Sequence, residues 1–189
     1  LIIMGGGPGG YNAAERAAHS GMKVALFEER ALGGVCLNEG CIPTKTLLYS
    51  AKMYDHATGG KKYGVTAENV VYDYKKIADR KTKVVRKLVA GIKMKMEHNN
   101  VEVVRGEASI VSGNAQVIAI ECNGEAYEAA RLLVCTGSEA FVPPIPGVEG
   151  NDAVLTNREI LALTEAPAGI VVIGGGVIGM EFASLYNSL

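Results

Sequence analysis

The first ten residues contain the feature that most constrains the fold of this chain. Four apolar residues, Leu1–Met4, lead directly into a segment with glycine at positions 5, 7 and 10, and an alanine-rich stretch follows. In a strand–turn–helix context, this G-x-G-x-x-G spacing forms a dinucleotide-binding loop. The first glycine permits the tight turn, the second lets the backbone approach a pyrophosphate, and the third lets helix and strand pack closely. We therefore expect a Rossmann-like α/β domain at the N-terminus.

The same pattern occurs a second time towards the end of the chain. An apolar run, Ile170–Ile173, leads into glycines at positions 174, 176 and 179, and a helix is predicted after them. Two copies predict two dinucleotide sites. The residue that discriminates NAD from NADP lies about 20 residues beyond such a loop, which is past Leu189, so this choice stays open. Because the sequence stops inside the second predicted helix, we expect it to be part of a longer protein.

Further strands and helices alternate through the first half of the chain. Lys23–Phe27 is an apolar run that predicts a second strand. Glu28 ends this run, close to the spacing of about 20 residues at which an acidic side chain binds a ribose hydroxyl. One helix is predicted over residues 41–57, and a long one from a cap at Asp73 to about Asn99. Apolar strands that alternate with helices indicate a parallel sheet covered on both faces.

The periodicity changes to two between Val101 and Cys135. Short strands are predicted at 101–103, 108–110, 117–120 and 132–134, with turns at 112–114 and 123–124. This pattern is typical of a small antiparallel meander, here inserted in the nucleotide-binding domain. Three prolines within residues 142–147 predict a stiff linker. We therefore expect an N-terminal domain over residues 1–147 and the start of a second over residues 148–189.

Two of the four cysteines form a candidate redox pair. Cys36 and Cys41 lie five residues apart where a helix is predicted to start, and the positive end of a helix dipole stabilises a thiolate. A dithiol next to a flavin can pass two electrons by thiol–disulfide exchange. Two buried, reduced cysteines are the alternative. No further cysteine pair or neighbouring histidine completes a zinc site, so no metal site is predicted, and Cys122 and Cys135 receive no redox role.

Composition and charge exclude some classes of function. The chain has 189 residues, 48% of them apolar and 21% charged, and its net charge is -1. This balance gives no reason to expect a nucleic acid or an anionic membrane as partner. No apolar stretch approaches the roughly 20 residues that span a bilayer, and no basic segment precedes Leu1 as in a signal peptide. The long helix from Asp73 is rich in lysine and arginine; a basic docking face is one interpretation, and we favour a solvated face.

The segment Gly33–Lys45, GGVCLNEGCIPTK, resembles a family motif. It is similar to the pattern G-G-T-C-x-N-x-G-C-x-P-[ST]-K of the flavoprotein disulfide reductases, within the class I pyridine nucleotide-disulfide oxidoreductases, and most similar to that of the dihydrolipoamide dehydrogenases. This resemblance implies FAD and NAD as cofactors. Electrons would pass from dihydrolipoamide to the Cys36–Cys41 pair, then to FAD and on to NAD. Val35 stands where the family usually has threonine, so a hydroxyl contact to FAD is lost.

The resemblance also implies roles for individual residues. Cys36 is the thiol that exchanges with the substrate, Cys41 the thiolate that contacts the flavin, and Lys45 lies near the reactive edge of the flavin with Glu181 as its partner. The implied FAD contacts are Gly5, Gly7, Pro8, Gly9, Gly10, Glu28, Glu29, Gly34, Val35, Cys36, Cys41, Lys45, Ala108, Thr136, Gly137 and Ser138. The implied NAD contacts are Gly174, Gly176, Val177, Ile178 and Gly179.

Partners and location are implied in the same way. The resemblance predicts a homodimer that acts on a small molecule or a lipoyl domain, alongside the other components of 2-oxo acid dehydrogenase complexes. The location would be cytoplasmic, or the mitochondrial matrix in a eukaryote. Two alternatives remain. One is a disulfide reductase for glutathione-like or mercuric substrates. The other is an FAD-binding fragment without turnover, because the family's catalytic His–Glu pair comes from a C-terminal interface domain.

Overall fold

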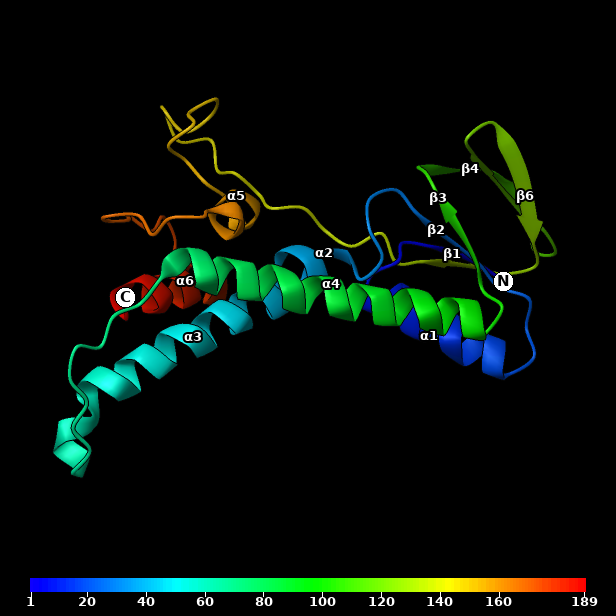
Figure 1. The fold of residues 1–189 in the computed structure, drawn as a ribbon. Helices are drawn as coiled ribbons and strands as arrows, with labels where there is room; N and C mark the ends of the chain where they lie inside the picture. The colour runs from blue at the N-terminus through cyan, green and yellow to red at the C-terminus, as the bar shows by residue number, and fades with distance from the viewer. The chain divides into compact units, whose positions relative to one another are not determined.

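The computed structural model describes residues 1–189, drawn in Figure 1. The chain forms two compact units. The first comprises residues 1–38 and 86–139, and the second comprises residues 39–85 and 140–189. The long helix α4, Tyr74–His98, contributes residues to both. No helix combines the length and the apolar composition that a membrane-spanning segment requires.

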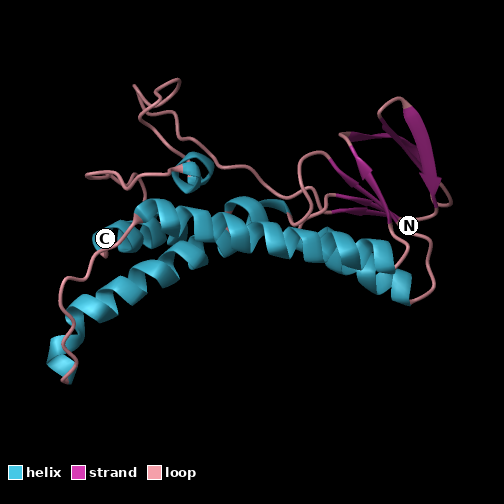
Figure 2. Cartoon of the chain, in the orientation of Figure 1, coloured by secondary structure: helices cyan, strands magenta, loops and turns pink.

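The first unit is built on a parallel sheet. Its strands are β1 (Ile2–Met4), β2 (Ala25–Glu28), β3 (Glu102–Arg105) and β7 (Leu132–Val134), in the order β3-β2-β1-β7. All three pairings are parallel, and Figure 2 shows these strands in magenta. Helix α1 (Pro8–His19) connects β1 to β2. The predicted α/β fold with a parallel sheet is confirmed.

A second, antiparallel sheet completes this unit. It consists of β4 (Ala108–Gly113), β5 (Ile118–Cys122) and β6 (Glu125–Ala129), paired in chain order. Asn123 and Gly124, with φ of 55° and 80°, make the tight turn between β5 and β6. One hydrophobic cluster joins residues of both sheets: Ile2, Met4, Phe27, Ile120 and Cys122.

The meander differs from the sequence prediction in its membership. The runs predicted at 101–103 and 132–134 belong to the parallel sheet as β3 and β7, and β6 was not predicted. Both β3 and β7 are largely exposed edge strands. Runs of three or four residues are too short for their periodicity to identify the partner strand.

The second unit is helical. It contains α3 (Cys41–Gly59), the 3-10 turn η1 (Gly60–Tyr63), the first half of α4, α5 (Asn157–Ala162) and α6 (Val177–Asn187). Its core is the cluster Leu47, Ala51, Leu161, Phe182 and Leu185. The predicted helix over 41–57 is confirmed, with two further residues at its end.

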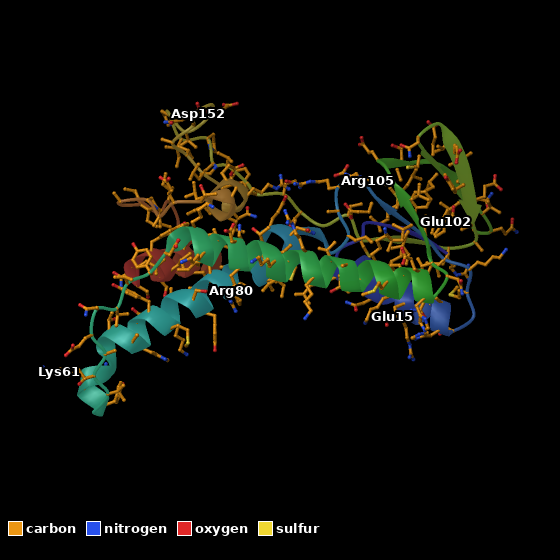
Figure 3. All side chains as sticks on the ribbon, viewed as in Figure 1. Glu15, Lys61, Arg80, Glu102, Arg105 and Asp152 are labelled. Atoms are coloured by element: carbon orange, nitrogen blue, oxygen red, sulfur yellow. The ribbon has the colours of Figure 1, made fainter.

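Polar contacts fix the helices of the second unit around this core. The main-chain N–H of Lys76 donates to Asp73 Oδ1 at 3.1 Å, which confirms Asp73 as the cap of α4. The guanidinium of Arg80, labelled in Figure 3, donates to the carbonyl of Thr46 on α3 at 3.0 Å. The hydroxyls of Tyr74 and Tyr186 lie 2.9 Å apart, which links α4 to α6.

Two features of the second unit were not predicted correctly. The strand expected at Ile170–Ile173 is absent, since no strand of the structure pairs with these residues, and Val171 is 92% exposed. Helix α5 was missed, although the sequence carried a signal for it. Thr156 and Glu159 form a reciprocal capping box at its start, with the Thr156 N–H donating to Glu159 Oε2 at 2.7 Å.

Candidate functional site

The glycine loop, residues 5–10, lies at the point where the strand order reverses. The chain runs from β1 outwards to β2 and β3, and then returns to place β7 on the other side of β1. The carboxyl ends of β1 and β7 therefore border the crevice at which open α/β sheets bind their ligands. Residues 5–10 follow β1 and residues 135–138 follow β7, so two predicted parts of the cofactor site meet here.

Two close backbone approaches explain the first and last glycines of the loop. Gly5 has a φ of +103°, and a β-carbon there would lie 2.1 Å from the carbonyl oxygen of Cys135. A β-carbon on Gly10 would lie 1.7 Å from the carbonyl oxygen of Gly5. Neither position accepts a larger side chain without a shift of main chain. The tight turn and the close helix–strand packing expected from the motif are both present.

The loop also meets the start of helix α2 (Gly34–Glu39). The main-chain N–H of Gly33 donates to the carbonyl of Gly6 at 2.8 Å. A β-carbon on Gly34 would lie only 2.6 Å from the α-carbon of Gly7, and Gly34 has a φ of +58°. Main chain therefore packs on main chain, and no side chain stands between the loop and α2. Main chain without side chains at the start of α1 leaves room for a pyrophosphate, which helix N-termini bind through free N–H groups.

Glu28 supports the loop from the end of β2. One carboxylate oxygen accepts the Gly6 N–H at 2.7 Å, and the other accepts the N–H groups of Arg30 and Ala31 at 2.8 and 3.1 Å. Each carboxylate oxygen has two lone pairs, so the one bound to Gly6 can accept a further bond, as a ribose hydroxyl would require. Gly6 was not among the predicted residues. Its role depends on a contact between residues 22 apart, which the motif does not encode.

The turn after β7 completes this edge. The Cys135 N–H donates to the carbonyl of Met4 at 2.7 Å, and Thr136, Gly137 and Ser138 follow it, exposed. The Cys135 sulfur lies 3.4 Å from the position of a β-carbon on Gly9, so it packs on the start of α1. Of the other predicted contacts, Glu29 and Val35 are exposed and Ala108 begins β4.

The two candidate redox cysteines are placed on consecutive helices. Cys36 is half-buried on α2, where Leu37 is buried and the Asn38 amide donates to the carbonyl of Gly34 at 2.9 Å. Cys41 is exposed and is the first residue of α3. The predicted placement of Cys41 at the start of a helix is confirmed. Cys36 belongs to the first compact unit and Cys41 to the second.

One turn beyond Cys41, α3 carries the predicted lysine. The Lys45 ammonium forms an ion pair with the carboxylate of Glu181 on α6. The lysine side chain is 61% exposed and the glutamate side chain 21%. The structure thus brings together two residues 136 positions apart that the resemblance had paired, and it leaves the lysine accessible to a ligand.

The second glycine loop repeats the geometry of the first. Gly174 has a φ of +103°, the same as Gly5, and a β-carbon on Gly179 would lie 2.9 Å from the carbonyl oxygen of Gly174. Val177 begins α6, as Pro8 begins α1. The glycine turn and the helix therefore form here although the preceding strand does not.

Comparisons with known proteins agree with this description. The family model described as pyridine nucleotide-disulphide oxidoreductase matches residues 1–189. A dihydrolipoyl dehydrogenase of Acholeplasma laidlawii is 46% identical over 100% of this chain and 56% of its own length. A dihydrolipoyl dehydrogenase of Bacillus subtilis is 41% identical over 100% of this chain and 42% of its own length. The chain thus spans about half the length of the curated relatives it matches.

Two solved structures share the fold. The HOCl-induced flavoprotein disulfide reductase RclA from Escherichia coli matches with a TM-score of 0.80 and 31% identity, over 99% of this chain and 39% of that one. LpdA from Mycobacterium tuberculosis matches with a TM-score of 0.87 and 26% identity, over 99% of this chain and 42% of that one. The resemblance seen in the sequence is confirmed: this chain belongs to the pyridine nucleotide-disulphide oxidoreductase family.

Proposed function

We propose that the chain is the N-terminal part of a flavoprotein disulfide oxidoreductase that oxidises dihydrolipoamide and reduces NAD. One observation carries the proposal. Cys36 lies on the helix that packs against the glycine loop, and Cys41 starts the helix that bears the Lys45–Glu181 ion pair. Each cysteine lies on an element that also carries or contacts predicted cofactor-binding residues, which supports the proposal. The dihydrolipoyl dehydrogenases among the relatives favour lipoamide as the substrate class.

The protein side chains account for the disulfide exchange. In the oxidised enzyme, Cys36 and Cys41 form a disulfide. A substrate thiolate attacks the Cys36 sulfur, which breaks the Cys36–Cys41 bond and releases Cys41 as a thiolate. The second substrate thiol then displaces Cys36 from the mixed disulfide. The substrate loses two electrons and two protons and leaves as a cyclic disulfide, and the enzyme is left as the dithiol.

The glycine loops would hold the two cofactors. The first loop with Glu28 and the turn at 136–138 would hold FAD, and the second loop would hold NAD. FAD, when bound, supplies the two-electron acceptor that connects the dithiol with the nicotinamide. By the resemblance, Lys45 would lie near the reactive edge of the flavin, with Glu181 as its ion-pair partner. We place the boundary between the two nucleotide-binding domains at residues 147 and 148.

The whole protein would act as a homodimer on free or protein-bound lipoyl groups, in the cytoplasm or the mitochondrial matrix. Activity assays on matched proteins test this. Full-length protein should reduce NAD with dihydrolipoamide, whereas residues 1–189 alone should not, because the family's His–Glu pair lies outside them. Equal activity of the two proteins would contradict this division of function. Absence of activity in both would remove lipoamide as the substrate.

A second candidate is a disulfide reductase with another electron acceptor. The similar solved structures include a Cu(II) complex of RclA, a flavoprotein disulfide reductase, at 29% identity. The discriminating assay gives full-length protein dihydrolipoamide with NAD in one arm, and NADH or NADPH with Cu(II), Hg(II) or glutathione disulfide in the other. Faster turnover in the second arm would favour this candidate.

A further inference from the structure

One of the four residues between the two candidate redox cysteines is held by a separate helix. Glu39 is three residues after Cys36 and two before Cys41. Its carboxylate accepts a hydrogen bond from Arg158 Nε at 2.6 Å, and its main-chain carbonyl accepts one from the amide of Asn157 at 2.7 Å. Two consecutive residues at the start of α5 therefore form hydrogen bonds with both the side chain and the main chain of Glu39. All of these residues lie within the second compact unit.

The ion pair between Arg158 and Glu39 is partly shielded from solvent. The side chains of Arg158 and Glu39 are 32% and 23% exposed. An ion pair that is partly removed from water is screened less than one on an open surface. The hydrogen bond from a guanidinium to a carboxylate is also charge-assisted and directional. The contact can therefore restrain the backbone next to Cys41.

Helix α5 is itself firmly anchored, although it has only six residues. Leu161 is 5% exposed in the core that it shares with Leu47 and Ala51 of α3. The Lys81 ammonium donates to the Leu161 carbonyl at 2.5 Å. Burial of part of the Lys81 side chain lowers its pKa, because desolvation disfavours the charged ammonium. The capping box at Thr156 fixes the other end of the helix. A short helix held in this way can serve as a rigid support.

We propose that Arg158, with Asn157, is a positioning residue that holds the Glu39–Cys41 segment so that Cys41 meets the flavin. This inference rests on the proposed function. A disulfide forms only when its α-carbons are about 4.4–6.8 Å apart, and the released thiolate must then lie against the cofactor. Both conditions restrict the main chain between the cysteines. Glu39, to which Arg158 donates a hydrogen bond, lies in that stretch.

The test uses the full-length protein loaded with FAD, reduced by two electrons without oxygen. The readout is the long-wavelength absorbance band that a Cys41 thiolate gives against flavin. Arg158→Met should lower the amplitude of this band and slow flavin reduction by dihydrolipoamide about threefold to tenfold, the effect of one lost hydrogen bond. FAD content and KM should stay unchanged. Arg158→Lys keeps the charge but not the planar donor. Its band amplitude and its rate of flavin reduction should lie between those of the wild type and of Arg158→Met.

A coupling test separates positioning from a general loss of stability. Glu39→Gln should reproduce the effect of Arg158→Met, and the double variant should be no worse than either single one. The matched control is Lys95→Met, which breaks the 3.1 Å ion pair between α4 and Glu15 of α1, labelled in Figure 3. That control should leave the band intact. It tests whether loss of any interhelical ion pair has the same effect.

Each outcome has a distinct meaning. If the wild-type protein develops no such band, the proposed function fails before the variants are compared. If the wild-type band forms and Arg158→Met retains it at full amplitude, the positioning role is refuted. If Arg158→Met and Lys95→Met lower the melting temperature and the band equally, the contact is structural only, which also overturns the proposal.

Discussion

Gly5 passes so close to Cys135 that a β-carbon on the glycine would lie 2.1 Å from the cysteine carbonyl oxygen. The contact joins the end of β1 to the end of β7, and the Cys135 N–H bonds to Met4 beside it. The two strands thus meet at the crevice without any side chain between them. This relationship explains why the fold itself requires a glycine at the first position of the loop.

Replacing Gly5 by alanine should therefore damage both the fold and the cofactor site. The φ of +103° is unfavourable for alanine, at a cost of about 1–3 kcal/mol, and the contact with Cys135 adds to it. Thermal unfolding and the FAD content of the purified variant check this expectation. A Gly5→Ala variant with the stability and FAD content of the wild type would show that the loop differs from the one described.

Gly91→Ala is the matched control and should have the opposite effect on stability. Gly91 lies within helix α4, and a β-carbon there meets no atom within 4 Å. Alanine is favoured over glycine in a helix by about 0.8–1 kcal/mol. The free energy of unfolding should rise, with FAD binding unchanged. A fall would indicate that this face of α4 packs against a part of the protein outside residues 1–189.

The Glu28 carboxylate should determine how tightly the loop binds FAD. Glu28→Gln keeps the shape of the side chain but removes the charge that accepts the Gly6 N–H at 2.7 Å. Because charge-assisted hydrogen bonds are worth about 1.5–3 kcal/mol, the Kd for FAD should rise by about one to two orders of magnitude. Titration of the apoprotein with FAD measures this. Glu102→Gln on β3 is the control and should leave the Kd unchanged; an equal change in both variants would count against a specific role for Glu28.

Much of the fold could be predicted from local patterns, and the errors have a common physical cause. The strand–glycine–helix motif, the Asp73 cap and the helix from Cys41 depend on neighbouring residues, and the sequence shows them. Strand partners depend on residues far apart. Thus Leu132–Val134 was predicted in the meander but pairs with β1, and Ile170–Ile173 was predicted as a strand but finds no partner.

The candidate site was predictable to a similar extent. The motif around Cys36 and Cys41 and the pairing of Lys45 with Glu181 were expected from the resemblance. The hydrogen bonds from Asn157 and Arg158 to Glu39 were not expected, because they join residues 118 and 119 positions apart. The Thr156–Glu159 capping box was the only local sign that a helix begins beside them.

The Asp73 cap should make the folding stability of the protein depend on pH. Hydrogen bonds from the Lys76 N–H and ammonium hold the pKa of Asp73 below its ordinary value of 3.8. A carboxylate with a lowered pKa in the folded state stabilises the protein above pH 3.8, and this contribution is lost as the pH falls through the lowered pKa. Asp73→Ala should therefore lower the melting temperature at pH 7, with a smaller difference at pH 3. Asp79→Ala, on the same helix, is the control. An Asp73→Ala difference that does not change with pH would contradict the cap.

The two cysteines should have distinguishable roles. In full-length protein, Cys41→Ser should abolish the long-wavelength band of the two-electron-reduced enzyme, because the thiolate next to the flavin is gone. Cys36→Ser should remove turnover but leave a thiolate at Cys41 that can give the band without reduction. Cys135→Ala should preserve both band and turnover, since this sulfur packs on the start of α1. A band that survives in Cys41→Ser would refute the assignment.

The most direct test of the proposed function is the visible absorption spectrum of the purified full-length protein, before and after anaerobic addition of dihydrolipoamide. We expect a flavin spectrum that develops a long-wavelength charge-transfer shoulder, which requires FAD, the Cys36–Cys41 pair and a dithiol substrate together. A flavin spectrum that does not respond to dihydrolipoamide would contradict lipoamide as the substrate, and a protein that binds no flavin would contradict the proposed function as a whole.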